Sequence, residues 1–203
     1  MDTTTKIYLL RHGEIDLQEK KSFVGWTDVP LNEKGEAQAR WWRKRFAHSH
    51  FDMIFCSTLL RSKATAKILA HNRKTAITEL SRLREINLGE WEGLSHEEVR
   101  KRFPKEWEKR GSAMATYRPP GGESFSDLVN RVMPVFEKLV KNRGGDQLIV
   151  GHAGVNRVIL CSLLGMYLDN LFRLKQDYGA LNIINIEKER IKINLINMKP
   201  SIF

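Results

Sequence analysis

Two histidines in this chain stand at the ends of apolar runs that predict buried strands. His12 follows the run 7–10 and Arg11, and His152 follows the run 148–150 and a glycine. Short runs rich in strand-forming residues are typical of buried strands, and in open α/β sheets ligands bind at the carboxyl ends of the strands. We therefore expect Arg11, His12 and His152 to meet at one edge of a sheet.

Arg61 is predicted to reach the same edge. A further strand-like run ends at Ser57, and Arg61 follows about one helical turn later, on the same side. Guanidinium and imidazole N–H groups match the three equatorial oxygens of a phosphoryl group during its transfer. This set of arginines and histidines around one pocket favours phosphoryl chemistry.

A histidine can itself be the nucleophile in such chemistry. Its attacking nitrogen must be neutral, which happens when a backbone carbonyl holds the other ring nitrogen, and Gly13 beside His12 lets the backbone come close enough for that contact. A metal site is disfavoured, because Arg11 next to a divalent cation costs electrostatic energy and the HExxH spacing of zinc hydrolases is absent.

The segments between these residues alternate between strand and helix patterns. A helix is predicted over 33–47 with Asn32 as its N-cap, and a second over 58–70 with Thr58 near its cap. Ser95 opens a capping-box pattern before another helix. The other predicted elements are a strand over 52–57, a long helix after the turn 119–122 that contains Pro134, a helix that Gly165 closes, and strands over 181–187 and 191–197. This alternation predicts an α/β fold, a three-layer α/β/α sandwich with a mostly parallel central sheet.

Length and composition fit one domain over 1–203. At 203 residues and 41% hydrophobic residues, the chain is long enough to bury one sizeable core. No apolar run approaches the length that spans a bilayer, and residues 1–5 lack the basic start of a secretory signal. The two cysteines, Cys56 and Cys161, lie far from any second ligand at zinc-finger spacing. We expect a cytoplasmic protein without a disulfide framework or a structural zinc.

The net charge of +10 raises the question of an anionic partner. The basic residues are spread over the chain in short groups, and none of these groups carries a nucleic-acid recognition motif. Solvated helix faces and loop edges are the favoured interpretation. A small anionic substrate is therefore expected rather than a nucleic acid or a membrane, and the sequence predicts no particular oligomeric state.

Six motifs in chain order resemble those of the histidine phosphatase superfamily, whose other well-known branch is the cofactor-dependent phosphoglycerate mutases. They are RHGE at 11–14, GWTDVPLNEKGEAQA at 25–39, CSTLLRSKATA at 56–66, LREINLGEWEG at 83–93, PPGGESF at 119–125 and VGHAGVNR at 150–157. The resemblance covers nearly the whole chain. It implies a phosphoglycerate mutase-like version of the predicted fold.

The resemblance also implies a role for each residue of the site. His12 matches the nucleophile that becomes phosphorylated, and Glu85 matches the proton donor. The phosphate pocket is matched by Arg11, Arg61 and His152. No metal ion and no cofactor is implied.

Several positions bear on the substrate rather than on the reaction. Gln18 and Gly25 are candidate substrate contacts, although Gln18 stands where the family often has an asparagine. The segment 86–122 is a candidate cap over the site. From chemistry alone Glu85 is not distinguished from Glu92 or its other acidic neighbours, because most such carboxylates face water.

Within the superfamily, the compact segment 95–116 favours a phosphatase over a mutase. The segments PPGGESFSDLVNRV and LFRLKQDYGALNIINIE resemble the α-ribazole phosphatases of cobalamin biosynthesis most. We expect a phosphomonoesterase that acts on a small phosphorylated metabolite, with α-ribazole 5′-phosphate as the candidate. A phosphoglycerate mutase and a broad-specificity sugar-phosphate phosphatase are the alternatives.

Two hypotheses from other classes are weaker. A noncatalytic binder of anions or nucleic acid is favoured only by the charge of +10, and the presence of both His12 and Glu85 speaks against it. A cysteine phosphatase needs a Cys-x5-Arg loop with glycines. The spacing from Cys56 to Arg61 is one residue short, and this loop contains no glycine.

Overall fold

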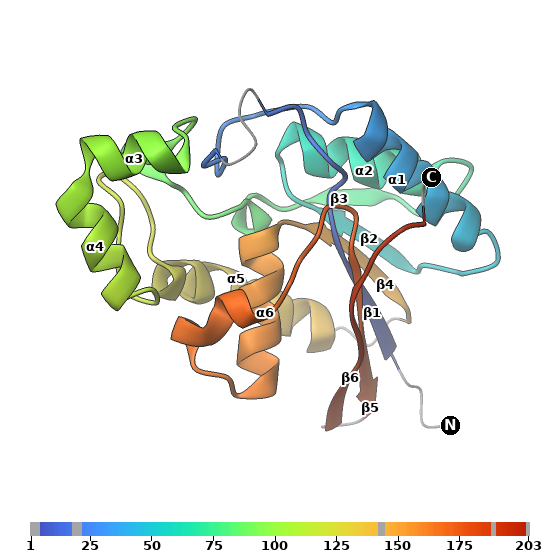
Figure 1. The fold of residues 1–203 in the computed structure, drawn as a ribbon. Coiled ribbons are helices and arrows are strands. Elements are labelled where there is room, and N and C mark those ends of the chain that lie inside the picture. Colours follow the sequence, from blue (N-terminus) through green and yellow to red (C-terminus); the bar gives the residue numbers. More distant parts are fainter. Residues whose placement is uncertain (1–4, 18–21, 142–144, 188–189, 202–203) are drawn as a thin grey trace.

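The computed structural model describes residues 5–17, 22–141, 145–187 and 190–201, and within them one six-stranded sheet forms the centre of the molecule (Figure 1). The strand order is β3-β2-β4-β1-β5-β6. The strands are β1 (Thr5–Arg11), β2 (Met53–Cys56), β3 (Ile77–Glu79), β4 (Gln147–Gly151), β5 (Leu181–Glu187) and β6 (Arg190–Met198). β3, β2, β4 and β1 pair in parallel, whereas β5 and β6 add to the sheet in antiparallel pairs. The predicted α/β sandwich is confirmed, with a mixed sheet.

Two helices cover each face of this sheet. α1 (Glu33–Arg45) packs beside α2 (Leu60–Ala70) on one face, and α5 (Phe125–Lys141) packs beside α6 (Ala153–Leu164) on the other (Figure 1). The parallel strands alternate with these helices along the chain, because a parallel connection needs a crossover of a dozen or more residues. The crossovers place the carboxyl ends of β1, β2 and β4 at one edge.

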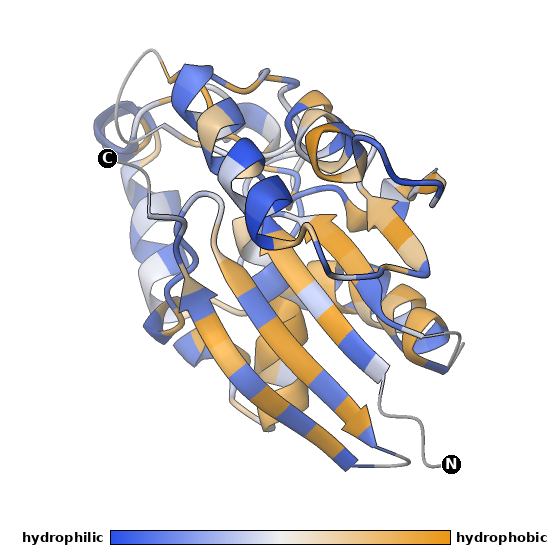
Figure 2. Ribbon diagram, turned by 90° about the vertical axis from the view of Figure 1, so that its right-hand side faces the viewer, coloured by the Kyte–Doolittle hydropathy of each residue, from blue (hydrophilic) through white to orange (hydrophobic). Residues whose placement is uncertain are grey.

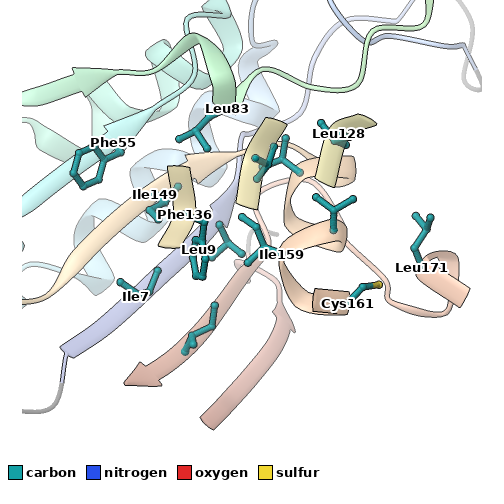
Figure 3. Close-up of a cluster of buried hydrophobic side chains, with 14 of the residues drawn as sticks. Ile7, Leu9, Phe55, Leu83, Leu128, Phe136, Ile149, Ile159, Cys161 and Leu171 are labelled. Atoms are coloured by element: carbon teal, nitrogen blue, oxygen red, sulfur yellow. The ribbon is translucent and has the colours of Figure 1, made fainter. Parts of the chain in front are cut away.

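Successive residues of the central strands enter different hydrophobic clusters, as the period of two in a strand requires. Leu9 and Ile149 pack with Phe136 and Ile159 from α5 and α6 (Figure 3). Their neighbours Leu10 and Val150 belong to the cluster on the α1 and α2 face instead. Figure 2 shows the resulting apolar strands, with polar residues alternating along the edge strand β6.

The predicted helix ends are confirmed at three places. The Asn32 side chain accepts a hydrogen bond from Gly35 N at 2.8 Å and begins α1. Ser95 forms its capping box and begins α3 (His96–Arg102). Gly165 ends α6 with a φ of 61°, in the left-handed region that glycine adopts without strain.

Thr58 lies next to the cap position of the second helix, as predicted, but its side chain does not cap the helix. α2 begins at Leu60, its cap position is Leu59, and no side chain of that residue caps it. The Thr58 hydroxyl accepts from Arg84 Nε at 2.5 Å instead, while Asp28 Oδ1 accepts from Leu60 N at 2.7 Å. A side chain distant in sequence therefore satisfies this helix end.

The segment 86–122 builds a separate lobe beside the sheet (Figure 1). It contains α3, which was predicted, and α4 (Pro104–Ser112) and the short helix η2 (Gly89–Trp91), which were not. Its small cluster centres on Trp91 and Val99 and includes Phe23 from the loop after β1. No helix in the described part of the chain is long and apolar enough to cross a membrane.

Candidate active site

His12 and His152 lie side by side because β1 and β4 are neighbours in parallel register. Arg11 pairs with Gly151, so the residue after each strand emerges at the same edge. The two imidazole rings lie edge to face with their centroids 5.0 Å apart. Both side chains are buried. The predicted meeting of the two strand ends is confirmed.

The His12 ring is held in one tautomer. Its Nδ1 lies 2.7 Å from the Gly13 carbonyl oxygen, which can only accept, so Nδ1 carries the proton and Nε2 keeps a lone pair. Burial, followed by the charges of Arg61 and Arg11, lowers the pKa of His12 well below its usual 6.5. The ring is therefore neutral at neutral pH. A Cβ on Gly13 would collide with the backbone of Gly35, so only glycine fits.

Arg61 is a fully buried cation held by backbone. Its Nη1 donates to Thr27 O at 2.8 Å and its Nη2 donates to Gly25 O at 2.6 Å. Nε of Arg61 is buried without a partner. Burial lowers the pKa of Arg61, opposed chiefly by the charge of Glu85, but a guanidinium stays charged in proteins.

Arg11 brings a second guanidinium to the site. Its Nη1 donates to Gln176 O at 2.6 Å, and its Nε is buried without a partner. The guanidinium carbon lies 3.7 Å from the centroid of the Tyr178 ring, a cation–π contact. The same ring lies 5.7 Å from that of His12. Tyr178 thus holds Arg11 beside the histidine.

His152 is oriented by a serine at the end of β2. Its Nε2 lies 2.7 Å from Ser57 Oγ, which also accepts from Leu59 N at 3.3 Å. The other ring nitrogen, Nδ1, is buried without a partner in the described part of the chain. Burial, followed by the charge of Arg61, lowers the pKa of His152 well below 6.5, so this ring is neutral as well.

Glu85 is a buried carboxylate attached to the turn after His152. Its Oε2 accepts from Gly154 N at 2.9 Å and its Oε1 accepts from Ile86 N at 2.9 Å. A Cβ on Gly154 would collide with Glu85 Oε1, which explains the glycine at this position. Each carboxylate oxygen keeps a second lone pair for a ligand.

One cavity of about 320 Å³ joins most of these groups, but His152, which contacts the His12 ring, is not among its lining residues. Arg11, His12, Arg61 and Glu85 all line it, and so does Tyr178. Aromatic rings and two further arginines form other parts of its wall, namely Phe23, His96, Arg110, Phe125, Arg157 and Phe172. The cavity combines a neutral imidazole, buried cations and a carboxylate, which is a set that can bind and transfer a phosphoryl group.

The remaining predicted residues have different outcomes. Gln18 lies outside the described residues. Gly25 binds Arg61 through its carbonyl, and its contact with a substrate stays a prediction. Cys56 is fully buried away from the cavity in the α1 and α2 cluster, and burial raises the pKa of its thiol to about 12. A protonated thiol is a poor nucleophile, which argues against the cysteine mechanism.

Sequence reasoning missed Tyr178 and Glu92. Tyr178 comes from the loop before β5, far from the motifs of β1, and only the folded chain brings it to Arg11. Glu92 was grouped with carboxylates that face water, yet it accepts from the backbone of the loop that holds Arg61. No element was predicted around Glu92, so no signal of this contact was present in the sequence.

Comparisons with known proteins find related sequences and related folds. A family model described as the histidine phosphatase superfamily (branch 1) matches residues 7–199. Phosphoserine phosphatase 1 of Hydrogenobacter thermophilus is 28% identical over 95% of this chain and 92% of its own length. An adenosylcobalamin/α-ribazole phosphatase of Salmonella typhi is 26% identical over 96% of both chains. The crystal structure of the α-ribazole phosphatase from Shigella flexneri superposes with a TM-score of 0.88 at 24% identity, over 95% of this chain and 96% of that chain.

Proposed function

Because this chain belongs to branch 1 of the histidine phosphatase superfamily, we propose that it is a phosphomonoesterase that works through a phosphohistidine on His12. One observation carries the proposal. The Nδ1 of His12 is held by the Gly13 carbonyl, so its Nε2 is a neutral nucleophile beside two arginines whose buried Nε groups have no partner within the described residues. A phosphate dianion supplies the acceptors that these donors lack.

In the first step, His12 Nε2 attacks the phosphorus of the ester. The N–P bond forms while the ester P–O bond breaks, and Arg11, Arg61 and His152 stabilise the charge on the equatorial oxygens. Glu85, protonated in the substrate complex, gives its proton to the departing alcohol oxygen. The products of this step are the free alcohol and phosphohistidine.

In the second step, water cleaves the phosphohistidine. Glu85 is now a carboxylate and takes a proton from the attacking water, while the P–O bond forms and the N–P bond breaks. Inorganic phosphate leaves, and His12 is neutral again. The protein supplies every group that these two steps use.

For the substrate, we propose α-ribazole 5′-phosphate, a small phosphomonoester with an aromatic base. Phe23, Phe125 and Phe172 line the cavity that contains His12 and could stack on such a base. The segment 86–122 contributes His96 and Arg110 to the same wall, which supports its role as a cap.

A second candidate is a phosphomonoester with a further negative charge, such as phosphoserine. Arg110 and Arg157 also line the cavity, with their guanidinium carbons 5.7 and 5.0 Å from the Phe172 ring centroid. Neither forms an ion pair within the described residues, and the Arg157 Nε donates to Leu174 O at 2.9 Å. A carboxylate on the substrate would give these two cations a partner.

Phosphate release from a panel of esters tests the proposal. The panel contains α-ribazole 5′-phosphate, phosphoserine, 3-phosphoglycerate and a sugar phosphate, and 3-phosphoglycerate is also followed for isomerisation as a mutase would perform it. We expect phosphate release that is lost in His12→Ala. Isomerisation without phosphate release would contradict hydrolysis.

Arg110→Ala distinguishes the two substrate candidates, with the exposed neighbour Lys109→Ala as its control. If the second charge is recognised, Arg110→Ala weakens kcat/KM for phosphoserine and leaves that for α-ribazole 5′-phosphate nearly unchanged. An equal effect on both esters would show that Arg110 does not read a second charge.

A further inference from the structure

Glu92, directly after the short helix η2, binds the loop after β1 through four hydrogen bonds and accepts a fifth from its own segment. Its Oε2 accepts from Gly25 N at 3.0 Å, Thr27 N at 3.2 Å and Thr27 Oγ1 at 2.7 Å. Its Oε1 accepts from Trp26 N at 2.6 Å and from Leu88 N at 3.2 Å. One carboxylate therefore satisfies three consecutive backbone N–H groups, at residues 25–27.

The carbonyls of the same loop hold Arg61. Gly25 O accepts from Arg61 Nη2 at 2.6 Å, and Thr27 O accepts from Nη1 at 2.8 Å. No ion pair with Arg61 is found in the described part of the chain, so neutral carbonyls determine where this buried guanidinium lies. The backbone N–H groups of the loop thus donate to Glu92, while two of its carbonyl groups accept from Arg61.

The backbone of this loop packs closely against Glu92 at Gly25. A Cβ added to Gly25 would collide with the Ile86 carbonyl and with Glu92 Oε1. The charge of Glu92 also favours the charged form of Arg61. A glutamine at 92 would turn an amide NH₂ group toward backbone N–H donors, so it could not replace the carboxylate.

We propose that Glu92 is a positioning residue, which fixes the guanidinium of Arg61 through the loop 25–27 without touching the substrate. The inference rests on the proposed function, in which Arg61 binds the transferred phosphoryl group. Preorganised charge is effective because it needs no rearrangement during the reaction. Loosening the loop would let Arg61 move away from the place where the phosphate charge develops.

Glu92→Gln tests the inference, with Glu90→Gln, at the exposed carboxylate two residues earlier in η2, as its matched control. The readouts are the inhibition constant of orthovanadate and kcat/KM for p-nitrophenyl phosphate. We expect Glu92→Gln to raise the inhibition constant of orthovanadate and to lower kcat/KM, each by about tenfold or more. This is the order found when a residue that supports a binding group is removed. Glu90→Gln should match the wild type.

A double-mutant cycle with Arg61→Ala separates positioning from a general structural role. If Glu92 acts through Arg61, adding Glu92→Gln to Arg61→Ala changes kcat/KM by less than about twofold, since interacting sites are not additive. A full additional loss in that background would overturn the inference. So would an unchanged orthovanadate inhibition constant in Glu92→Gln.

The loop also touches Glu85, because Trp26 Nε1 donates to Glu85 O at 2.8 Å. If Glu92 acted through that proton donor, Glu92→Gln would slow the hydrolysis of an alkyl phosphate more than that of p-nitrophenyl phosphate. That result would show that the inference is wrong. Equal losses for the two esters are expected from an effect on Arg61.

A milder variant covers the case in which Glu92→Gln does not fold. Thr27→Val removes only the hydroxyl bond to Glu92 and keeps the Thr27 carbonyl on Arg61. It should weaken orthovanadate binding in the same direction, and an unchanged affinity would contradict the inference.

The failure of this inference is distinguishable from the failure of the proposed function. A wild type that cleaves esters while Glu92→Gln is indistinguishable from it would remove only the inference. A wild type that cleaves no ester, but loses orthovanadate affinity on Glu92→Gln, would remove only the proposed function.

Discussion

The Nδ1 of His12 and the carbonyl oxygen of Gly13 lie 2.7 Å apart, in a hydrogen bond between neighbouring residues. This bond determines which ring nitrogen is protonated, and burial beside two arginines keeps the ring neutral. A residue that would be a weak nucleophile as an imidazolium is thereby available at neutral pH.

The pH profile of kcat/KM should show the effect of Arg61 on His12. Burial and the charge of Arg61 lower the pKa of His12 well below 6.5, so protonation should abolish the nucleophile only at low pH. Arg61→Gln removes that charge, raises the pKa of His12 and moves the acid limb to higher pH. The substitution should also weaken transition-state stabilisation by about 3 kcal/mol, which lowers kcat/KM roughly a hundredfold.

The exposed Arg40→Gln on α1 is the control, because it changes the net charge by the same amount. Both variants and the wild type are measured on one substrate, so that its own ionisation cancels. An acid limb that stays in place in Arg61→Gln would show that Arg61 does not set the charge state of His12.

Folding stability should fall as the pH decreases below about 6.5. The folded-state pKa values of His12 and His152 are lowered from 6.5, so the unfolded chain binds more protons in this range. The stability is fully present above the unfolded pKa and is lost as the pH falls toward the folded pKa. Each histidine contributes at most about 1.4 kcal/mol per pH unit.

Urea unfolding between about pH 7.5 and pH 5.5 measures this slope. His152→Asn should reduce the slope, whereas the exposed His71→Asn should leave it unchanged. If His152→Asn has the slope of the wild type, His152 is not held neutral by the fold.

The loss of Glu85 should depend on the leaving group. An alkyl alcohol needs a proton to depart, whereas p-nitrophenol leaves without one, so Glu85→Gln should slow the phosphorylation of His12 severely only for the alkyl ester. A rapid-quench burst of p-nitrophenol is compared with the single-turnover rate on the alkyl ester. Equal losses would move the proton donor to Glu14 or another carboxylate.

Cys56→Ala should keep the activity of the wild type, and a chelator should leave the wild type active. The Cys56 thiol is buried, with its pKa raised to about 12, and it does not line the cavity with His12. Phosphate release is assayed for the folded variant and for the wild type with excess chelator. An inactive but folded Cys56→Ala would restore the cysteine mechanism, and strong inhibition by chelator would contradict the metal-free steps.

The strand-end residues could be predicted because their signal is local. Apolar runs that end in Arg11-His12 and Gly151-His152 define both the strand and the place where its side chains emerge. Asn32 and Ser95 were predictable for the same reason, since an N-cap bonds to residues two or three positions later.

The rest depends on contacts between distant segments. Thr58 resembles a cap but bonds to Arg84, and Asp28 takes its place at the helix end. Glu92 and Glu90 are alike in sequence, and only the packing of the loop 25–27 against η2 makes one of them an acceptor for that loop. Tyr178 is known as a partner of Arg11 only once β5 is placed beside β1.

Trapping the covalent intermediate tests the central claim most directly. The enzyme is mixed with substrate, quenched in alkali, in which phosphohistidine survives, and digested for mass spectrometry. The mechanism predicts one phosphoryl group on the peptide that contains His12, formed and lost at rates that account for turnover, and none in His12→Ala. Turnover with no phosphoryl group on His12, or with the group on His152 instead, would contradict it.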